Sequence, residues 1–383
     1  MTASVLLVCP LATSAAEIRV AAGESIQAAI DKAAAGDVIT LAEGVFAERI
    51  TLAKPITVQG AGWEKTLLKP AAKAGDKTQA EKLAFVDRLE GTGDPREQMR
   101  LMQEFLGGSA PPTVAVTSAK DVTLRGLRIG GIAPTNVEML TADALVHFKA
   151  APQAKMIDCA VVGPYMNGVA VTDGSEVEIK STLVAALWGT GIAVYPGEQR
   201  GVGKPATLKL IESDVRNCYH RCVTIACEGT TIDHCRISGS AWHGVRYDHC
   251  SPTITSSHLF GSARCGIYAS GKTAATVRNN VFWRNEMSAI SCWFANADAI
   301  ENNTMIENVR EGIAVLGGAK PTLTRNVIVG NPIGVVCNQV NGQENAGPGE
   351  PKLEKNLLWK NEKDLAKGDE VQPLPEGNVV ADA

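Results

Sequence analysis

The sequence predicts an all-β solenoid, and three observations on its second half support this. The pattern of residues 230–251 returns at steps of 22 or 23 residues as far as Cys337. Two columns of Asn and Gly positions keep their register from one repeat to the next. Each repeat carries only short runs of apolar, often β-branched residues, broken by Asn, Gly or Ser, which favours strands over helices. A repeat of this length built from short strands is typical of a stacked solenoid.

The columns fix the register of the predicted strands. The first holds Cys235, Ser257, Asn280, Asn303 and Asn326, and the second holds Gly244, Gly266, Ala289, Gly312 and Gly334. A β-branched residue follows each member of the second column, and we expect these residues to face inward while the next ones along the strand face outward. We expect the Asn side chains of the first column to hydrogen bond from rung to rung, as in stacked in-register strands.

These repeats resemble the right-handed parallel β-helix, or pectin-lyase-like, superfamily, over roughly residues 18–361. The resemblance implies a right-handed parallel β-helix solenoid with one rung per repeat. Residues 25–33 place apolar side chains at helical spacing behind a Ser N-cap, which predicts an N-terminal helical cap over the first rung. Residues 71–111 break the repeat with helical periodicity, which predicts a helical insertion on the flank of the solenoid or, alternatively, a lid over a cleft.

The chain therefore divides into five predicted segments. These are a signal peptide (1–16), the N-terminal cap and first rungs (17–70), the helical insertion (71–111), the parallel β-helix repeats (112–363) and an extended C-terminal tail (364–383). The signal peptide rests on a short apolar run followed by the small residues 14–16, although a buried first strand would explain the same run. A cleaved signal predicts a secreted or periplasmic protein.

Composition excludes several classes of partner. A net charge of −4 and a pI near 5.9 give no basic surface for nucleic acid. No apolar run approaches the ~20 residues that a membrane-spanning helix needs. We expect a monomer whose partner is an acidic polysaccharide.

The cysteines predict neither a full set of disulfides nor a metal site. Nine cysteines follow residue 16, and an odd number cannot pair completely. Cys227 and Cys250 are the one pair on adjacent rungs in nearly the same column. Cys218, Cys222 and Cys227 lack the matching second half that a zinc site requires. No cofactor is required by the sequence, and a role for Ca²⁺ is left open.

Charged and aromatic residues gather on the outward positions of a few successive rungs. Loops at 195–205 and 338–350 follow the same strand of the repeat and are predicted to frame the face between them. The candidate catalytic residues are Arg246, Tyr268, His243, Arg264 and Asp248, and the candidate substrate-binding residues are His220, Trp242, Trp293 and Arg310. No metal ligand is assigned.

These residue types suit chemistry on a uronate. Arg246 and Arg264 can each bind a carboxylate through two hydrogen bonds, which makes the proton on the adjacent carbon easier to remove. Tyr268 stands one rung, ~4.8 Å, from Arg246 and can give or take a proton, with His243 or His220 performing the other half of the transfer. The tryptophans offer flat faces for sugar rings. This set resembles the polysaccharide lyases and uronate epimerases of the superfamily.

The sequence thus predicts an exported enzyme that acts on a uronate-containing polysaccharide by β-elimination or C5 epimerisation. Two alternatives stay open: a non-catalytic carbohydrate-binding or surface protein, and a glycoside hydrolase. Hydrolysis needs two carboxylates ~5–9.5 Å apart, for which Asp248 with Glu286 or Glu311 is the candidate pair. Asp248 can instead pair with Arg246 on its own rung.

Overall fold

The computed structural model describes six long stretches of the chain, together with scattered residues between 80 and 101. The long stretches are 15–70, 112–130, 144–163, 167–197, 203–340 and 347–381. The predicted signal peptide lies almost wholly outside the described residues, and so does most of the predicted helical insertion. Within that insertion, the described Phe85 and Leu101 are helical and buried.

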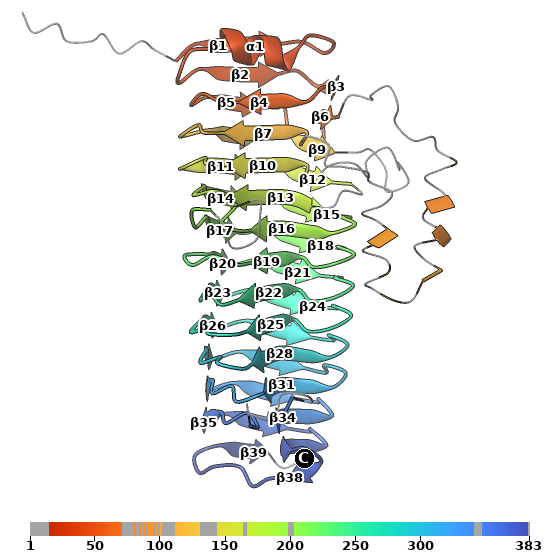
Figure 1. Cartoon of the computed structure of the whole chain (residues 1–383), viewed down its shortest axis with the longest axis vertical. Coiled ribbons are helices and arrows are strands. Elements are labelled where there is room, and N and C mark those ends of the chain that lie inside the picture. Colours follow the sequence, from red (N-terminus) through yellow and green to blue (C-terminus); the bar gives the residue numbers. More distant parts are fainter. Residues whose placement is uncertain are drawn as a thin grey trace, which may run out of the picture.

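Three parallel sheets of 13 strands each run the length of the molecule, confirming the predicted right-handed parallel β-helix. Each rung passes from sheet A to sheet B to sheet C, and the rungs stack into one elongated column (Figure 1).

The strands of the three sheets have the following bounds. Sheet A contains β1 Glu17–Val20, β2 Val38–Leu41, β5 Thr57–Gln59, β8 Thr123–Arg125, β11 Ala154–Ile157, β14 Glu176–Lys180, β17 Thr207–Ile211, β20 Thr231–Asp233, β23 Thr253–Thr255, β26 Thr276–Arg278, β29 Ala299–Glu301, β32 Thr322–Thr324 and β35 Lys352–Glu354. Sheet B contains β3 Gly44–Ala47, β6 Thr66–Lys69, β9 Arg128–Gly130, β12 Ala160–Val162, β15 Leu183–Ala185, β18 Asp214–Arg216, β21 Arg236–Ser238, β24 His258–Phe260, β27 Val281–Trp283, β30 Thr304–Ile306, β33 Val327–Val329, β36 Leu357–Trp359 and β39 Val379–Ala381. Sheet C contains β4 Ile50–Leu52, β7 Val114–Thr117, β10 Val146–Lys149, β13 Asn167–Thr172, β16 Thr190–Val194, β19 Val223–Ile225, β22 Val245–Asp248, β25 Ile267–Ser270, β28 Ser288–Trp293, β31 Glu311–Leu316, β34 Ile333–Asn338, β37 Lys363–Lys367 and β38 Glu370–Val371.

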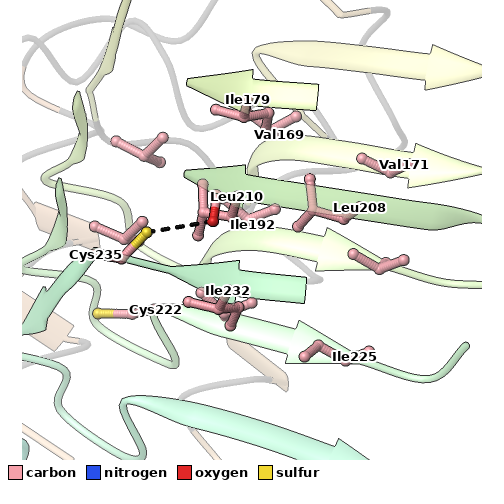
Figure 2. Packing of buried hydrophobic residues seen from close by; sticks show 14 of the residues in the cluster. Val169, Val171, Ile179, Ile192, Leu208, Leu210, Cys222, Ile225, Ile232 and Cys235 are labelled. Carbon is pink, nitrogen blue, oxygen red and sulfur yellow. Dashed lines mark hydrogen bonds between the residues drawn. The ribbon is translucent and has the colours of Figure 1, made fainter. Parts of the chain in front are cut away.

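The core is a continuous column of aliphatic side chains along the axis of the solenoid. The β-branched residues after the Gly column are fully buried, as the alternation of the strands predicts; they are Val245, Ile267, Ile290, Ile313 and Val335. Figure 2 shows part of the same core in earlier rungs, where Ile192, Leu208 and Ile232 are all fully buried. Burying one such side chain contributes about 1.5–3 kcal/mol, so each rung adds to stability only when its neighbours cover it.

A short helix, α1 (Ile26–Lys32), lies at the N-terminal end of the stack, where the sequence predicts one (Figure 1). Ser25 is its N-cap, and its side chain accepts a hydrogen bond from the Ala28 backbone N–H. Ile26 and Ile30 turn into the core, so the helix covers apolar surface that the first rung would otherwise expose.

The predicted Asn ladder is present at the corner between sheets A and B. The Oδ1 of Asn303 accepts hydrogen bonds from both the backbone N–H and the side-chain amide of Asn280, each at 3.0 Å. Asn303 in turn donates its own amide to Asn326 and to the Val277 carbonyl. Hydroxyls replace amides at this corner in earlier rungs, where Ser257 Oγ accepts from the Cys235 N–H.

A second Asn ladder, which the sequence analysis missed, runs along the corner between sheets B and C. Its members are Asn285, Asn308, Asn331 and Asn361. The last three each use Oδ1 to accept from the backbone N–H of the ladder residue one rung earlier, and Asn285 accepts from the Ser262 N–H. Two of the three corners of the C-terminal rungs are therefore held by stacked amides.

Replacing Asn303 with alanine is expected to lower the free energy of unfolding by about 2–3 kcal/mol, because it leaves buried donors of Asn280 without an acceptor. Asn378→Ala removes the last member of the same ladder, which is only half-buried, and should cost less. Urea unfolding of both variants measures the difference. Equal losses would mean that the burial of the substituted residue does not set the cost, because Asn378 likewise accepts two N–H groups, from Asn356.

The solenoid extends further than the sequence predicted. The predicted boundary at residue 363 falls inside β37, and β38 and β39 lie within the segment predicted as an extended tail. The physical reason is that the first ladder continues: Asn378 accepts from both the backbone and side-chain N–H groups of Asn356. β38 closes sheet C by pairing antiparallel with β37.

The nine cysteines of the described residues are all buried free thiols. Burial raises the pKa of the Cys159 and Cys250 thiols to about 12, so both stay protonated at neutral pH. They act as small apolar side chains of the core. None of the helices in the described part of the chain has the length and apolar character that crossing a bilayer requires.

Candidate functional site

The outer face of sheet C carries the predicted columns in the predicted register. Arg246 pairs with Tyr268 on the next strand, and Tyr268 pairs with Ser291. In the second column Asp248 pairs with Ser270, which pairs with Trp293. Since side chains alternate along each strand, both columns project from the same face.

A cavity of about 480 Å³ opens on this face over β25, β28, β31 and β34. The predicted site residues that line it are His243, Arg264, Tyr268, Trp293 and Arg310. Gln339 and Val340, at the start of the loop predicted over 338–350, form part of its wall. No described residue of the other predicted loop, 195–205, lines it.

Tyr268 lies among rings and one guanidinium. Its ring centroid is 4.7 Å from that of His243 and 5.6 Å from that of Trp293. The Arg246 guanidinium carbon is 5.3 Å from the centroid. Burial raises the pKa of the Tyr268 phenol, while the positive charge of Arg246 acts in the opposite direction. At neutral pH the group is therefore a phenol in contact with a cation.

Arg246 does not line the cavity, because Asp248 holds it. Arg246 Nε donates to Asp248 Oδ2 at 2.6 Å, and Nη2 donates to Oδ1 at 3.2 Å. This is the bidentate pairing that the sequence left as the alternative for Asp248. Arg246 therefore forms an ion pair with Asp248 on its own strand, and its guanidinium also lies over the ring of Tyr268.

Arg264 is the cation that faces the cavity. Its guanidinium stacks 4.4 Å from the ring centroid of Trp242, and it has no ion-pair partner in the described part of the chain. Arg310 also lines the cavity but lies 3.4 Å from Glu311. Stacking on an aromatic ring holds a guanidinium in place while leaving its N–H groups available to a ligand.

His243 is buried and neutral. Burial, followed by the positive charges of Arg221 and Arg264, lowers its pKa to about 3. Its Nδ1 accepts a hydrogen bond from the Cys265 backbone N–H at 3.3 Å, so in the neutral ring the proton resides on Nε2. His243 is therefore placed to donate a hydrogen bond from Nε2 rather than to take a proton there.

The remaining predicted residues lie beside the cavity. The rings of His220 and Trp242 are 4.9 Å apart on the corner that leads to it. Sequence reasoning did not include Ser288 and named Glu311 only as a possible hydrolytic carboxylate with Asp248. Both line the cavity, and Ser288 Oγ donates to Glu311 Oε2 at 2.8 Å. Both residues could have been found from the sequence, because each directly precedes a member of the Gly column, as His243 does.

The stacked parallel sheets and this outer face define a right-handed parallel β-helix protein with one candidate site across several rungs. Residues 170–369 match the family described as periplasmic copper-binding protein (NosD). Because the match spans more than half of the chain, the chain belongs to this family. No curated protein matches the chain at a significant level.

Solved structures share the fold at low sequence identity. The periplasmic alginate epimerase AlgG is similar with a TM-score of 0.53 at 12% identity, over 94% of this chain and 82% of the epimerase. The catalytic unit of an α-1,3-glucanase from Streptomyces thermodiastaticus has a TM-score of 0.62 at 13% identity, over 93% of this chain and 64% of that chain. Tailspike protein 2 of an Escherichia coli bacteriophage has a TM-score of 0.54 at 12% identity, over 91% of this chain and 43% of the tailspike. At these identities the likeness shows the fold alone.

The residues that the structure describes do not fit a copper site. Among them, no group of three or more His, Cys, Asp or Glu side chains lies close enough together to hold a metal ion. The thiolate is the form of cysteine that binds metal, whereas burial holds the pKa of the Cys222 thiol well above its usual range. The Nδ1 atoms of His243 and His249 already accept backbone N–H groups.

Proposed function

We propose that the outer face of sheet C binds a uronate-containing polysaccharide. A side chain in the cavity then removes the proton from the carbon next to the uronate carboxylate. The outcome is β-elimination or C5 epimerisation. One observation carries the proposal: Arg264, Tyr268 and Trp293 line the same open cavity, and Arg264 has no ion-pair partner in the described residues. The names of the alginate epimerase and the glucanase support a carbohydrate substrate.

The proposed place of action is outside the cytoplasm. The family is described as periplasmic, and so is the similar alginate epimerase. The apolar run near the N-terminus is the kind of segment that directs export.

Arg264 is assigned to the carboxylate. A guanidinium bound to a uronate carboxylate withdraws negative charge, which stabilises the carbanion that develops on the adjacent carbon. Arg310 lies on the same wall and supplies a second positive charge, shared with Glu311. The stacking of Arg264 on Trp242 fixes the guanidinium before the substrate arrives.

Tyr268 is assigned to the proton transfer. The phenol first releases its proton to solvent, and the phenolate then takes the proton from C5. In elimination, the electrons of the C5–H bond form the C4–C5 double bond, the C4–O bond breaks, and the phenol returns the proton to the leaving oxygen. In epimerisation a water molecule in the open cavity gives a proton to the opposite face of C5, and the resulting hydroxide takes the proton back from the Tyr268 phenol. The Arg246 guanidinium over the ring favours the phenolate, and neutral His243 donates a hydrogen bond from Nε2 to a substrate oxygen.

Replacing Tyr268 with phenylalanine is expected to lower turnover of a uronate polysaccharide at least ~100-fold while substrate binding is kept, because general acid–base groups contribute about that much. Ultraviolet absorbance of unsaturated uronate detects elimination, and NMR of the uronate composition detects epimerisation. Tyr195→Phe removes a hydroxyl from a tyrosine that does not line the cavity and serves as the matched control.

Two outcomes would replace the proposal. Reducing ends released without unsaturated products would indicate a hydrolase, although Glu311 is the only carboxylate among the described residues that line the cavity. No unsaturation, no reducing ends and no change in uronate composition would leave a non-catalytic carbohydrate-binding protein.

A further inference from the structure

A second hollow of about 400 Å³ lies at the corner between sheets B and C, on the N-terminal side of the cavity. Its lining includes Trp188, Tyr219, Asn217, Gly239 and Ala241, and it shares no lining residue with the cavity. It is placed where the turns before β16, β19 and β22 stack on one another.

Two aromatic rings form one side of the hollow. The centroids of Trp188 and Tyr219 are 5.8 Å apart, with the ring planes 33° from parallel. In the next rung Ala241 takes the position of Tyr219. The Ala241 N–H donates to the Cys218 carbonyl, just as the Tyr219 N–H donates to the Leu187 carbonyl one rung earlier. The stack of Trp188 and Tyr219 is therefore followed by the small side chain of Ala241, which leaves room beside the Tyr219 ring.

The hollow differs from the cavity in charge. No charged side chain is among the described residues that line it, and the polar side chains include the Asn217 amide, which lies over Gly239. The cavity, in contrast, holds Arg264, Arg310 and Glu311. A pyranose ring presents an apolar C–H face and a rim of hydroxyls, so aromatic faces beside one amide suit a neutral sugar.

A row of flat groups joins the hollow to the cavity. Tyr219 is followed in the chain by His220, whose ring packs 4.9 Å from that of Trp242. Arg264 stacks on the same Trp242 ring and lines the cavity. The rung of β19, beside the hollow, lies two rungs before β25 and three before β28 in the cavity. The separation is roughly 10–14 Å at ~4.8 Å per rung. A pyranose residue advances a polysaccharide by about one rung.

We propose that this hollow is a distal subsite that binds a neutral sugar residue of the same polysaccharide chain whose uronate occupies the cavity. The inference rests on the proposed function for the choice of occupant. The substrate then lies along the solenoid axis, and an oligosaccharide of two residues bound in the cavity is too short to reach the hollow.

The test compares oligosaccharides of two and six residues by isothermal titration calorimetry, with galacturonate oligomers and cello-oligomers as probes. Trp188→Ala is expected to weaken binding of the six-residue probes about three- to tenfold and to leave digalacturonate, which occupies the cavity alone, unchanged. The effect on cellohexaose should be at least as large as that on hexagalacturonate. Trp359→Ala, which removes an exposed tryptophan from sheet B, is the control and should change neither.

Several results would overturn the subsite. These are an equal loss for digalacturonate and hexagalacturonate, no loss for any six-residue probe, an effect confined to hexagalacturonate, and no binding of any six-residue probe by the native protein. Trp188→Phe keeps a flat ring and should restore most of the affinity, which separates stacking from misfolding. Failure of the proposed reaction looks different: no uronate polymer is turned over, while the effect of Trp188→Ala on the binding of cellohexaose persists.

Discussion

Replacing Asp298 with alanine is expected to lower the free energy of unfolding by about 3–6 kcal/mol. Asp298 is fully buried and accepts hydrogen bonds from the Tyr247 hydroxyl at 2.5 Å, the Asn296 side-chain amide at 2.6 Å and the Ala275 backbone N–H at 2.7 Å. The substitution leaves three buried donors without an acceptor, and each costs about 1–3 kcal/mol. Urea unfolding followed by circular dichroism measures the loss.

Tyr247→Phe is the graded control for this network. It removes one donor and leaves Asp298 with its bonds to Asn296 and Ala275, so a loss of only about 1–2 kcal/mol is expected. Solvent entering the core would blunt the difference between the two variants. If Asp298→Ala cost no more than Tyr247→Phe, the interior would be hydrated at this rung and the bonds to the Asp298 carboxylate would contribute little.

The second large effect concerns acid. The pKa of His243 is about 3 in the folded protein against 6.5 for an ordinary histidine. Between these values the unfolded chain binds a proton that the folded chain does not, so stability falls as pH falls. The loss is about 1.4 kcal/mol per pH unit, or on the order of 4–5 kcal/mol across the window from pH 6.5 to pH 3. Stability above pH 6.5 is unaffected by this group.

His243→Gln should flatten this part of the pH dependence, because glutamine has no proton to bind. Urea midpoints of the native protein and the variant, taken from pH 7.5 to pH 4, measure the two slopes. His258→Gln removes an exposed histidine and should leave the slope as it is in the native protein. Parallel slopes for the native protein and His243→Gln would show that the imidazole is charged inside the fold.

The fold could be predicted from the sequence because a solenoid repeats one set of constraints at every rung. Ile267 and Ile290 follow the Gly column and are buried at equivalent positions. One repeat therefore predicts which side chains face inward in many strands. Interactions that cross the interior were outside this reasoning. Tyr247 and Asp298 are 51 residues apart and meet two rungs along the stack, and no column contains both.

The candidate site was predicted only in part, for a similar physical reason. Column positions place Arg246 and Tyr268 on one face, but they do not say which charge pairs with which. Asp248 on the same strand accepts two hydrogen bonds from Arg246, so the cations that line the cavity are Arg264 and Arg310 instead. The protonation of His243 depends on burial and on the Cys265 N–H, neither of which can be read from a repeat.

The two Asn ladders have a mechanical consequence. Amides hold both corners of the C-terminal rungs, whereas the corner between sheets A and B in earlier rungs is held by single hydroxyls, such as Thr182 Oγ1 accepting from Cys159 and Ser213 Oγ accepting from Thr182. A chain pulled by its two ends would unravel from the N-terminal side. Each rung would release about 80 Å of polypeptide, at ~3.5 Å per residue. The resisting force would step upward at the rung of Asn280, where amides replace hydroxyls, so the C-terminal rungs would be the last to yield.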